Sequence, residues 1–377
     1  MTHERKYRSL RRHCRHRRPR SPRGGDRTRD HWSDAFVSFN LGGKRSLSID
    51  LKTSEGAEIV RELAEKTDVL VENFRPGVLE RFDLDYESVS ETNESVVYCS
   101  ISGFGQSGPY RDYPAYDPIA QALGGIMDKT GYPDRPPVRI GASFIDCGTA
   151  VHAALFIASA LLERERTGEG HYIDTSLFDT VVSWMAYSIA HYDRTGDRPR
   201  RNGTGVGVVD QIYGTKDEEF LYVKAITQAQ YERLCEALDR PDILADERFA
   251  KLEELDAHAD ELEAELEAEF ATFELDEIMS LLASVNVPAG AVQNVGTLVD
   301  ADPHVAAREM LEESFDPVRE TTVTTATLPL RTEEGKPEFR NRPPDQGEHN
   351  REILSEIGYP DKRIEELRQN QVIHDSD

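Results

Sequence analysis

The chain has 377 residues, which exceeds the usual size of a single hydrophobic core and predicts two domains. Its formal charge is −25, although residues 1–30 carry 12 Lys or Arg against 3 acidic residues, so the rest of the chain is strongly acidic. Such an acidic, Lys-poor body is typical of halophilic proteins, whose carboxylates keep the surface hydrated, and it argues against nucleic acid as a partner.

The first segment, residues 1–23, is basic, has almost no apolar residues and shows no periodicity. It therefore cannot fold by burying surface, and the simplest interpretation is a disordered tail. Its Arg density would also suit a nucleic-acid arm or a targeting peptide. On an otherwise acidic chain we favour another interpretation, in which the segment comes from a mis-called start or a frameshift.

From Phe36 on, short apolar runs alternate with segments of helical spacing, which is typical of an α/β protein. The predicted strands are 46–49, 68–71, 96–101 and 172–174, and the predicted helices are 53–66, 79–89, 119–127, 149–165 and 177–191. Strands that alternate with helices favour a Rossmann-like parallel sheet with crossover helices. We expect this large domain to span residues 24–195.

A polar link rich in Arg and Gly follows at 196–212, and we expect a domain boundary there. Beyond it, residues 213–320 predict a smaller α+β domain, with a hairpin over 211–225 and acidic amphipathic helices over 228–284. Residues 321–377 return to the large domain, with a strand-like run at 321–330 and a final helix near 350–357.

Several classes of site and location find no support in the sequence. It contains no phosphate-binding loop, no zinc-protease motif and no serine-hydrolase motif, and its His residues lack ligand spacing, so we expect no metal. The four cysteines show no paired spacing, which indicates reduced thiols and a cytoplasmic protein. No run of about 18 apolar residues occurs, so we expect no membrane partner.

The most prominent candidate for chemistry is Asp146, a lone carboxylate in RIGASFIDCGTA. Small residues flank it on both sides, which would let a bulky ligand approach, and it stands just ahead of a predicted apolar helix. Asp is also a preferred N-cap, because its side chain accepts backbone N–H bonds and its charge suits the helix dipole. Residue types alone favour the cap.

A series of motifs changes this balance. In chain order they are LGGKRSLSIDLKT, DVLVENFRPGVLERF, VVYCSISGFGQSGPY, AYDPIAQALGG, PPVRIGASFIDCGTA and LLERERTGEGHYIDTSLFD. Together they resemble the class III CoA-transferases, the CaiB/BaiF family that includes formyl-CoA transferases, carnitine CoA-transferases and α-methylacyl-CoA racemases. The likeness runs from about Gly24 to the end, and it implies an interlocked homodimer that acts on acyl-CoA and small carboxylic acids.

The resemblance implies that Asp146 is the catalytic nucleophile. Its carboxylate would attack an acyl-CoA carbonyl to give a mixed anhydride, and the CoA thiolate would then attack the aspartyl carbonyl. Nearby backbone N–H groups could stabilise the oxyanions, and the Gly-rich segment 202–207 could shield the intermediate from water. CoA is then a substrate, and we expect no permanently bound cofactor.

The family's CoA contacts match nine residues of this chain. They are Arg29, Ile49, Lys52, Asn73, Phe74, Arg75, Arg81, Tyr116 and Asp117. The cations Arg29, Lys52 and Arg81 would meet the phosphates of CoA, with surface ion pairs as the alternative. Phe74 would lie against the adenine or the pantetheine, and Tyr116 and Asp117 would line the approach to Asp146.

Two features leave alternatives open. Family members open with a strand, a CoA-contacting turn and a helix, whereas residues 1–23 replace these here, which allows an inactive CoA-binding chain. Racemases of the same fold place a His where this chain has Tyr116. A phenol with a reference pKa of about 10 is a poor proton shuttle at neutral pH, so we favour CoA transfer over racemisation. The acids exchanged are not identifiable from the sequence.

Overall fold

The computed structural model describes residues 43–199, 201, 208–316, 321–333, 335 and 344–375. The basic segment 1–23, the predicted contact Arg29 and the Gly-rich segment 202–207 lie outside these residues. The chain divides into two compact units. The first unit holds the described residues up to Leu123, those of Ala142–Trp184 and those from Asp302 on, and the second holds Gly124–Gly141 and Met185–Ala301. The predicted boundaries at 196–212 and 320 stay predictions.

The first unit contains a three-stranded parallel sheet in the order β1-β2-β3. Its strands are β1 (Val69–Glu72), β2 (Val97–Ser102) and β3 (His171–Ser176). Parallel neighbours need crossover connections. One connection holds the 3₁₀ helix η1 (Leu79–Phe82) and α3 (Tyr86–Thr92), and the other holds α4 (Asp117–Leu123), α5 (Ile126–Lys129) and α6 (Phe144–Thr167). The predicted mixed α/β fold with a parallel sheet is confirmed.

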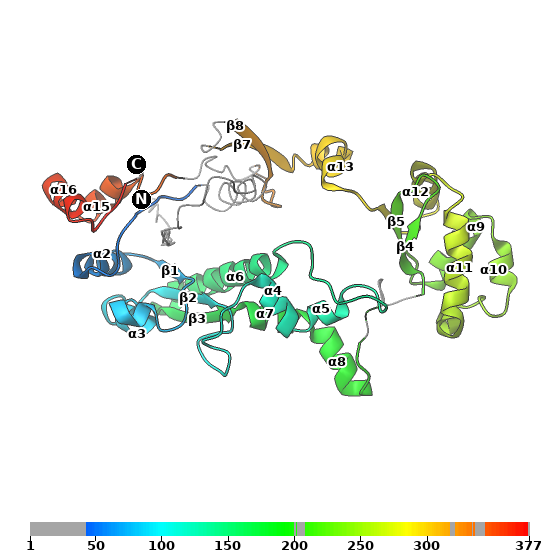
Figure 1. Ribbon diagram of the computed structural model, residues 1–377, viewed down its shortest axis with the longest axis horizontal. Coiled ribbons are helices and arrows are strands. Elements are labelled where there is room, and N and C mark those ends of the chain that lie inside the picture. Colours follow the sequence, from blue (N-terminus) through cyan, green and yellow to red (C-terminus); the bar gives the residue numbers. More distant parts are fainter. Residues whose placement is uncertain are drawn as a thin grey trace, which may run out of the picture. The chain divides into compact units, whose positions relative to one another are not determined.

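Helices cover both faces of this sheet (Figure 1). Successive strand residues point to opposite sides, and apolar side chains on each side pack against a helix. On one face Val69 and Val97 pack with Ala160 of α6. On the other face Leu70 and Tyr98 pack with residues of α3 and of α2 (Ser54–Ala64). The sheet is therefore the middle layer, and α6 is the crossover helix on one side.

The first unit contains further elements outside this sheet. They are α7 (Leu177–Trp184), α14 (Pro303–Ala307), the antiparallel pair β7 (Leu311–Asp316) and β8 (Thr321–Ala326), α15 (Asn350–Glu356) and α16 (Asp361–Gln369). Ile59 and Leu63 of α2 share a hydrophobic cluster with Leu354 and Ile364 of the last two helices. The C-terminal segment thus packs on the first helix of the described chain.

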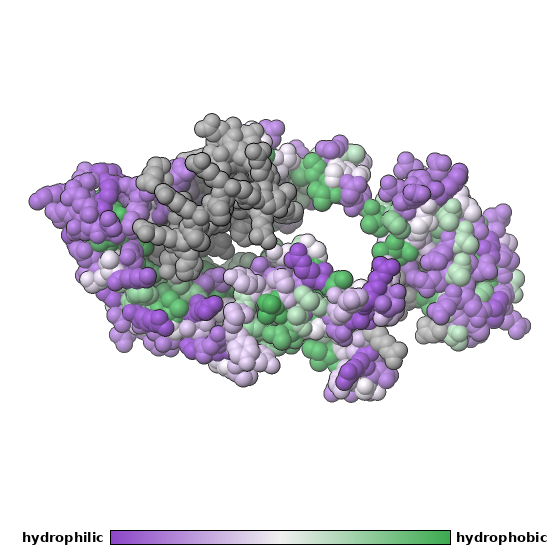
Figure 2. Space-filling model, in the orientation of Figure 1, coloured by the Kyte–Doolittle hydropathy of each residue, from purple (hydrophilic) through white to green (hydrophobic). Residues whose placement is uncertain are grey.

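The second unit is built on a three-stranded antiparallel sheet, β4 (Asp210–Gly214), β5 (Phe220–Lys224) and β6 (Ala289–Ala291). The predicted hairpin over 211–225 is confirmed by the pairing of β4 with β5. The helices of this unit, besides α5, are α8 (Ala186–Thr195), α9 (Gln228–Ala237), α10 (Pro241–Ala245), η2 (Leu252–His258), α11 (Ala259–Phe270), α12 (Leu275–Ser284) and α13 (Val295–Asp300). Hydrophilic residues dominate the visible surface around α10 and α11 (Figure 2).

Four predicted helices differ from the structure. The helix expected over 119–127 is interrupted at Gly124 and Gly125, between α4 and α5. The helix expected over 79–89 is two short helices, because Asp83 adopts a left-handed conformation with φ 53° and ends η1, which lets Leu84 turn inward to 2% exposure. The helix expected over 177–191 is divided at Met185 into α7 and α8. The helix expected over 149–165 begins at Phe144. Periodicity shows an apolar face but not the turn that interrupts it.

Candidate active site

Asp146 lies inside the first turn of α6. The N-cap of this helix is Ser143, whose side chain makes no capping hydrogen bond, and Asp146 is the third helical residue. The prediction that Asp146 stands ahead of the helix is therefore wrong, and so is its interpretation as an N-cap. Its carboxylate still benefits from the partial positive charge at a helix N-terminus.

The capping is done by Asp117, which is the first residue of α4. Its Oδ2 accepts the backbone N–H of Ile145 at 2.7 Å and that of Asp146 at 3.1 Å, while its Oδ1 accepts from Gln121 Nε2 at 2.5 Å. Asp117 is only 3% exposed. A buried carboxylate from another helix thus satisfies two of the N–H groups that a helix start leaves unpaired, and it fixes the backbone that carries Asp146.

The side chain of Asp146 is exposed, in contrast to that of Asp117. Within the described part of the chain its carboxylate has no hydrogen-bonding partner. Partial burial raises the pKa of Asp146 above its ordinary value, and the neighbouring charge of Asp117 raises this pKa further. A perturbed and accessible carboxylate of this kind is a candidate for covalent chemistry.

The small residues around Asp146 differ in how closely other side chains approach them. A Cβ at Gly148 would lie 1.9 Å from the ring of Trp184, so this glycine lets the last residue of α7 pack against α6. The ring of Phe144 lies 4.9 Å from that of Trp184, which completes this contact. By contrast, nothing lies within 4 Å of a Cβ at Gly141. The space that we expected a ligand to use is occupied by an indole at Gly148 and is open at Gly141.

The first turn of α6 lies at the carboxyl edge of the parallel sheet. At the other end of the helix, Arg164 donates to the backbone carbonyls of Asp68 and Ser95, both at 3.2 Å, which precede β1 and β2. Since α6 ends where these strands begin and runs antiparallel to them, its first turn lies on the side of the sheet where they end. The crevice outside the carboxyl ends of the strands is where open α/β sheets bind ligands.

Three of the predicted CoA contacts lie at the same edge, directly after β1. Asn73 Nδ2 donates to the carbonyl of Ile101 on β2 at 2.7 Å, and the N–H of Phe74 donates to Glu72 Oε2 at 2.7 Å. Arg75 is exposed. Sequence reasoning overlooked Glu72, because the predicted strand over 68–71 ended one residue before it, whereas β1 includes it.

The other predicted contacts are more scattered. Ile49 forms a β-bridge with Ile373, and the exposed Lys52 donates its N–H to Asp50 Oδ1 just before α2. Arg81 is exposed on η1. The contacts of Ile49 and Lys52 therefore tie them to neighbours other than Asp146.

Tyr116, the other residue expected near the nucleophile, immediately precedes α4. Its side chain is 77% exposed, and its carbonyl accepts the N–H groups of Ile119 and Ala120. The structure thus brings together Asp117 and Asp146 through direct hydrogen bonds, with Tyr116 as the chain neighbour of Asp117.

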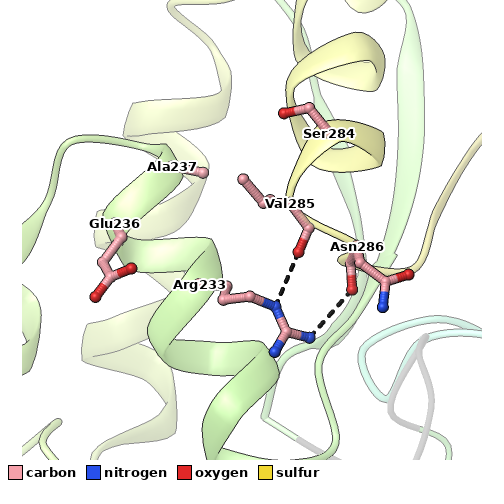
Figure 3. A pocket seen from close by; sticks show the side chains of 6 residues that line it. All are labelled: Arg233, Glu236, Ala237, Ser284, Val285 and Asn286. Carbon is pink, nitrogen blue, oxygen red and sulfur yellow. Dashed lines mark hydrogen bonds between the residues drawn. The ribbon is translucent and has the colours of Figure 1, made fainter.

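A separate hollow lies in the second unit, between α9 and the end of α12 (Figure 3). Arg233 reaches across it, and its guanidinium donates to the carbonyl of Val285 at 2.8 Å and to that of Asn286 at 3.2 Å. These carbonyls belong to the end of a helix, where a cation stabilises the unpaired acceptors. Arg233 therefore has a structural role in this hollow.

Comparisons with known proteins identify the family of this chain. The model of CoA-transferase family III matches residues 19–350. The succinyl-CoA:mesaconate CoA-transferase of Haloarcula hispanica is 36% identical over 346 residues, which are 90% of this chain and 86% of that protein. The succinyl-CoA–D-citramalate CoA-transferase of Chloroflexus aurantiacus is 34% identical over 317 residues, 83% of this chain and 78% of that protein.

A solved structure adds to these relatives. The crystal structure of a CAIB/BAIF family protein from Brucella suis matches with a TM-score of 0.75 and 35% identity, and covers 86% of this chain and 84% of that one. The resemblance that the motif series indicated is confirmed by the family match. It is also confirmed by CoA-transferases that match this chain over most of their length. The chain belongs to CoA-transferase family III, the CaiB/BaiF family, and is an enzyme of the CoA-transferase class.

Proposed function

We propose that this enzyme moves CoA between an acyl-CoA thioester and a small carboxylic acid through a covalent intermediate on Asp146. The observation that carries the proposal is an exposed carboxylate of raised pKa on a helix start whose backbone a second, buried carboxylate holds. This carboxylate lies at the sheet edge where α/β proteins bind ligands. The motif around it also matches the family's nucleophile.

In the proposed reaction a carboxylate oxygen of Asp146 attacks the thioester carbonyl, the C–S bond breaks, and CoA leaves as a thiolate. The thiolate then attacks the aspartyl carbonyl of the mixed anhydride, which releases the first acid and leaves an aspartyl-CoA thioester. An incoming carboxylate repeats both steps in reverse order and regains the free aspartate. The anhydride and the thioester preserve the activation of the acyl group, so a difficult transfer becomes a series of easier ones.

The raised pKa of Asp146 suits this role. Partial burial and the charge of Asp117 make its carboxylate more basic than an ordinary aspartate, which strengthens it as a nucleophile. The backbone N–H groups of Ile145 and Asp146 are occupied by Asp117, so oxyanions would need other donors.

The named relatives suggest which acids to try. One acts on succinyl-CoA and mesaconate, and another on succinyl-CoA and D-citramalate. We propose small dicarboxylic acids as the substrate class, with succinyl-CoA as the donor. An acidic chain of this kind is best assayed in high salt, because screening relieves the repulsion among its carboxylates.

We also propose that the active form is an interlocked homodimer. Apolar side chains of α6 are exposed, including Val151 at 66% and Leu155 at 60%. By length and composition this helix could cross a membrane, and 28% of its most apolar window is buried. Its other face packs on the sheet and its Arg164 binds strand-start carbonyls, so the uncovered face is better matched to a second copy of the chain.

The proposed function is tested by following CoA transfer from succinyl-CoA to mesaconate or citramalate by liquid chromatography. We expect a new acyl-CoA in amounts equal to the succinate released. Exchange of the α-proton of a 2-methylacyl-CoA without any new thioester would instead identify a racemase. CoA binding without either reaction would identify an inactive CoA-binding chain.

A further inference from the structure

We propose that Glu72 is a positioning residue for CoA, whose carboxylate holds the turn Asn73–Arg75 in the conformation that presents Phe74 and Arg75 to the ligand. The inference rests on the proposed function, because it assigns CoA to the sheet edge where this turn lies. It adds a residue that does not itself contact CoA.

The geometry of the turn carries the proposal. Glu72 is the last residue of β1 and is 9% exposed, and its Oε2 accepts the N–H of Phe74 at 2.7 Å. Asn73 Nδ2 ties the same turn to the carbonyl of Ile101 on the neighbouring strand at 2.7 Å. Beyond the strand the N–H of Phe74 no longer lies in the ladder of the sheet, and the carboxylate supplies its acceptor. Two side chains thus fix the backbone at Asn73 and Phe74.

A carboxylate that accepts this hydrogen bond must bury a negative charge, which costs desolvation free energy. Burial raises the pKa of Glu72, the hydrogen bonds from the Phe74 N–H and the Ser100 hydroxyl lower it, and the charge of Asp174 raises it. A Gln would offer the same acceptor oxygen without desolvating a charge. The charge-assisted bond is shorter and stronger than a neutral one. The carboxylate of Glu72 therefore holds the turn more firmly than an amide oxygen would.

Several ionisable groups lie near Glu72 in the sheet. Ser100 on β2 and Asp174 on β3 stand in the same row of the sheet as Glu72. The phenols of Tyr98 and Tyr172 and the thiol of Cys99 also sense its charge, and burial raises the pKa of each, that of Cys99 to about 12. The acidic neighbour whose charge raises the pKa of Glu72 is Asp174.

The test compares E72A and E72Q with the wild-type protein by calorimetric titration of CoA and by transfer kinetics. We expect E72A to raise the Kd and the KM for the CoA substrate about tenfold or more, with a smaller change in kcat, because the turn is no longer held. E72Q keeps an acceptor but loses the charge, so its Kd at neutral pH should lie between that of the wild type and that of E72A. The control D217N removes the charge from another carboxylate that accepts a backbone N–H, that of Leu275 in the second unit, and should leave CoA binding unchanged.

The pH profile separates positioning from mere stability. Wild-type affinity for CoA should fall as pH drops through the raised pKa of Glu72, whereas E72Q should lack this component, the titration of CoA itself being common to both. The thermal stability of E72Q should equal or exceed that of the wild type at neutral pH, because a carboxyl with a raised folded pKa loses its stabilising contribution as pH rises.

The results that would overturn the proposal are distinct from failure of the proposed function. A folded E72A that binds CoA as tightly as the wild type would overturn the role of Glu72 alone. If E72A does not fold, an E72Q profile identical to that of the wild type would do the same. A wild-type protein that binds no CoA would overturn the proposed function, and the role of Glu72 with it.

Discussion

Asp117 accepts the backbone N–H of Asp146 at 3.1 Å, so one acid holds the helix turn that carries the other. The buried carboxylate of Asp117 accepts hydrogen bonds from Ile145, Asp146 and Gln121, whereas the exposed carboxylate of Asp146 has no hydrogen-bonding partner among the described residues. The two carboxylates are also electrostatically coupled, since the charge of Asp117 raises the pKa of Asp146. This division of roles generates most of the predictions that follow.

Removal of the Asp146 carboxylate should abolish transfer and leave CoA binding intact. In D146N the side chain keeps its shape but loses its nucleophilic oxygen, so we expect kcat to fall at least about a thousandfold, as for other covalent catalysts that lose their nucleophile. The Kd for CoA should stay within about threefold, since the predicted CoA contacts are elsewhere. Steady-state kinetics and calorimetry measure the two effects, and undiminished transfer by D146N would refute the nucleophile assignment.

Replacement of Asp117 by Asn should shift the pH dependence of transfer. The nucleophile must be ionised, so activity falls as pH drops through the pKa of Asp146, which lies above its ordinary value of 3.8. D117N removes the negative charge that raises this pKa, and the acidic limb should therefore move to lower pH. An acidic limb that stays in place, or moves upward, would contradict the coupling.

The same substitution has a cost in stability that can be measured separately. The Asn side chain keeps an acceptor for the N–H groups of Ile145 and Asp146, whereas Ala leaves them unpaired. We expect D117A to lower the free energy of unfolding by about 1–3 kcal/mol and D117N by less. Chemical denaturation in high salt gives both values, and equal stabilities for the two variants would argue against the capping role of Asp117.

Gly148 should tolerate no side chain. A Cβ there would lie 1.9 Å from the Trp184 ring, so G148A must displace either α7 or the indole and should destabilise the protein by about 1–3 kcal/mol. The matched control is G141A, where nothing lies within 4 Å of the added carbon. Thermal unfolding of the pair tests the packing, and similar melting temperatures for both would show that Trp184 is free to move.

The uncovered face of α6 should be sensitive to charge if it forms the proposed dimer interface. Leu155 is 60% exposed, and L155D would place a carboxylate in an apolar contact that a second copy must desolvate. We expect this variant to sediment as a monomer and to lose transfer activity. Circular dichroism checks that the monomer is folded, and a wild-type protein that is monomeric at assay concentration would refute the dimer.

Local pattern was sufficient to predict the parallel sheet and the β4–β5 hairpin. The buried runs that became β1 and β2 and the alternation of strands with helices carry that information directly. The motif series added the family and changed the interpretation of Asp146 from an N-cap to a nucleophile. These features depend on neighbours in the chain or on an order of motifs shared with a known family, and a sequence displays both.

The roles of Asp117, Gly148 and Glu72 were not predictable in this way. Asp117 caps a helix that starts 27 residues later, and Gly148 is small because of an indole on a different helix. Both are tertiary contacts between residues far apart in the chain, and sequence periodicity does not predict such contacts. Glu72 acts on its own chain neighbour, Phe74, but only its burial in the sheet shows why a carboxylate there is unusual.

The central claim is most directly tested by intact-protein mass spectrometry after incubation with succinyl-CoA, followed by trapping with hydroxylamine or borohydride and peptide mapping. The account predicts an acyl or CoA adduct whose trapped form maps to Asp146, and no adduct in D146N. Transfer without any adduct, or an adduct that maps to another residue, would contradict it.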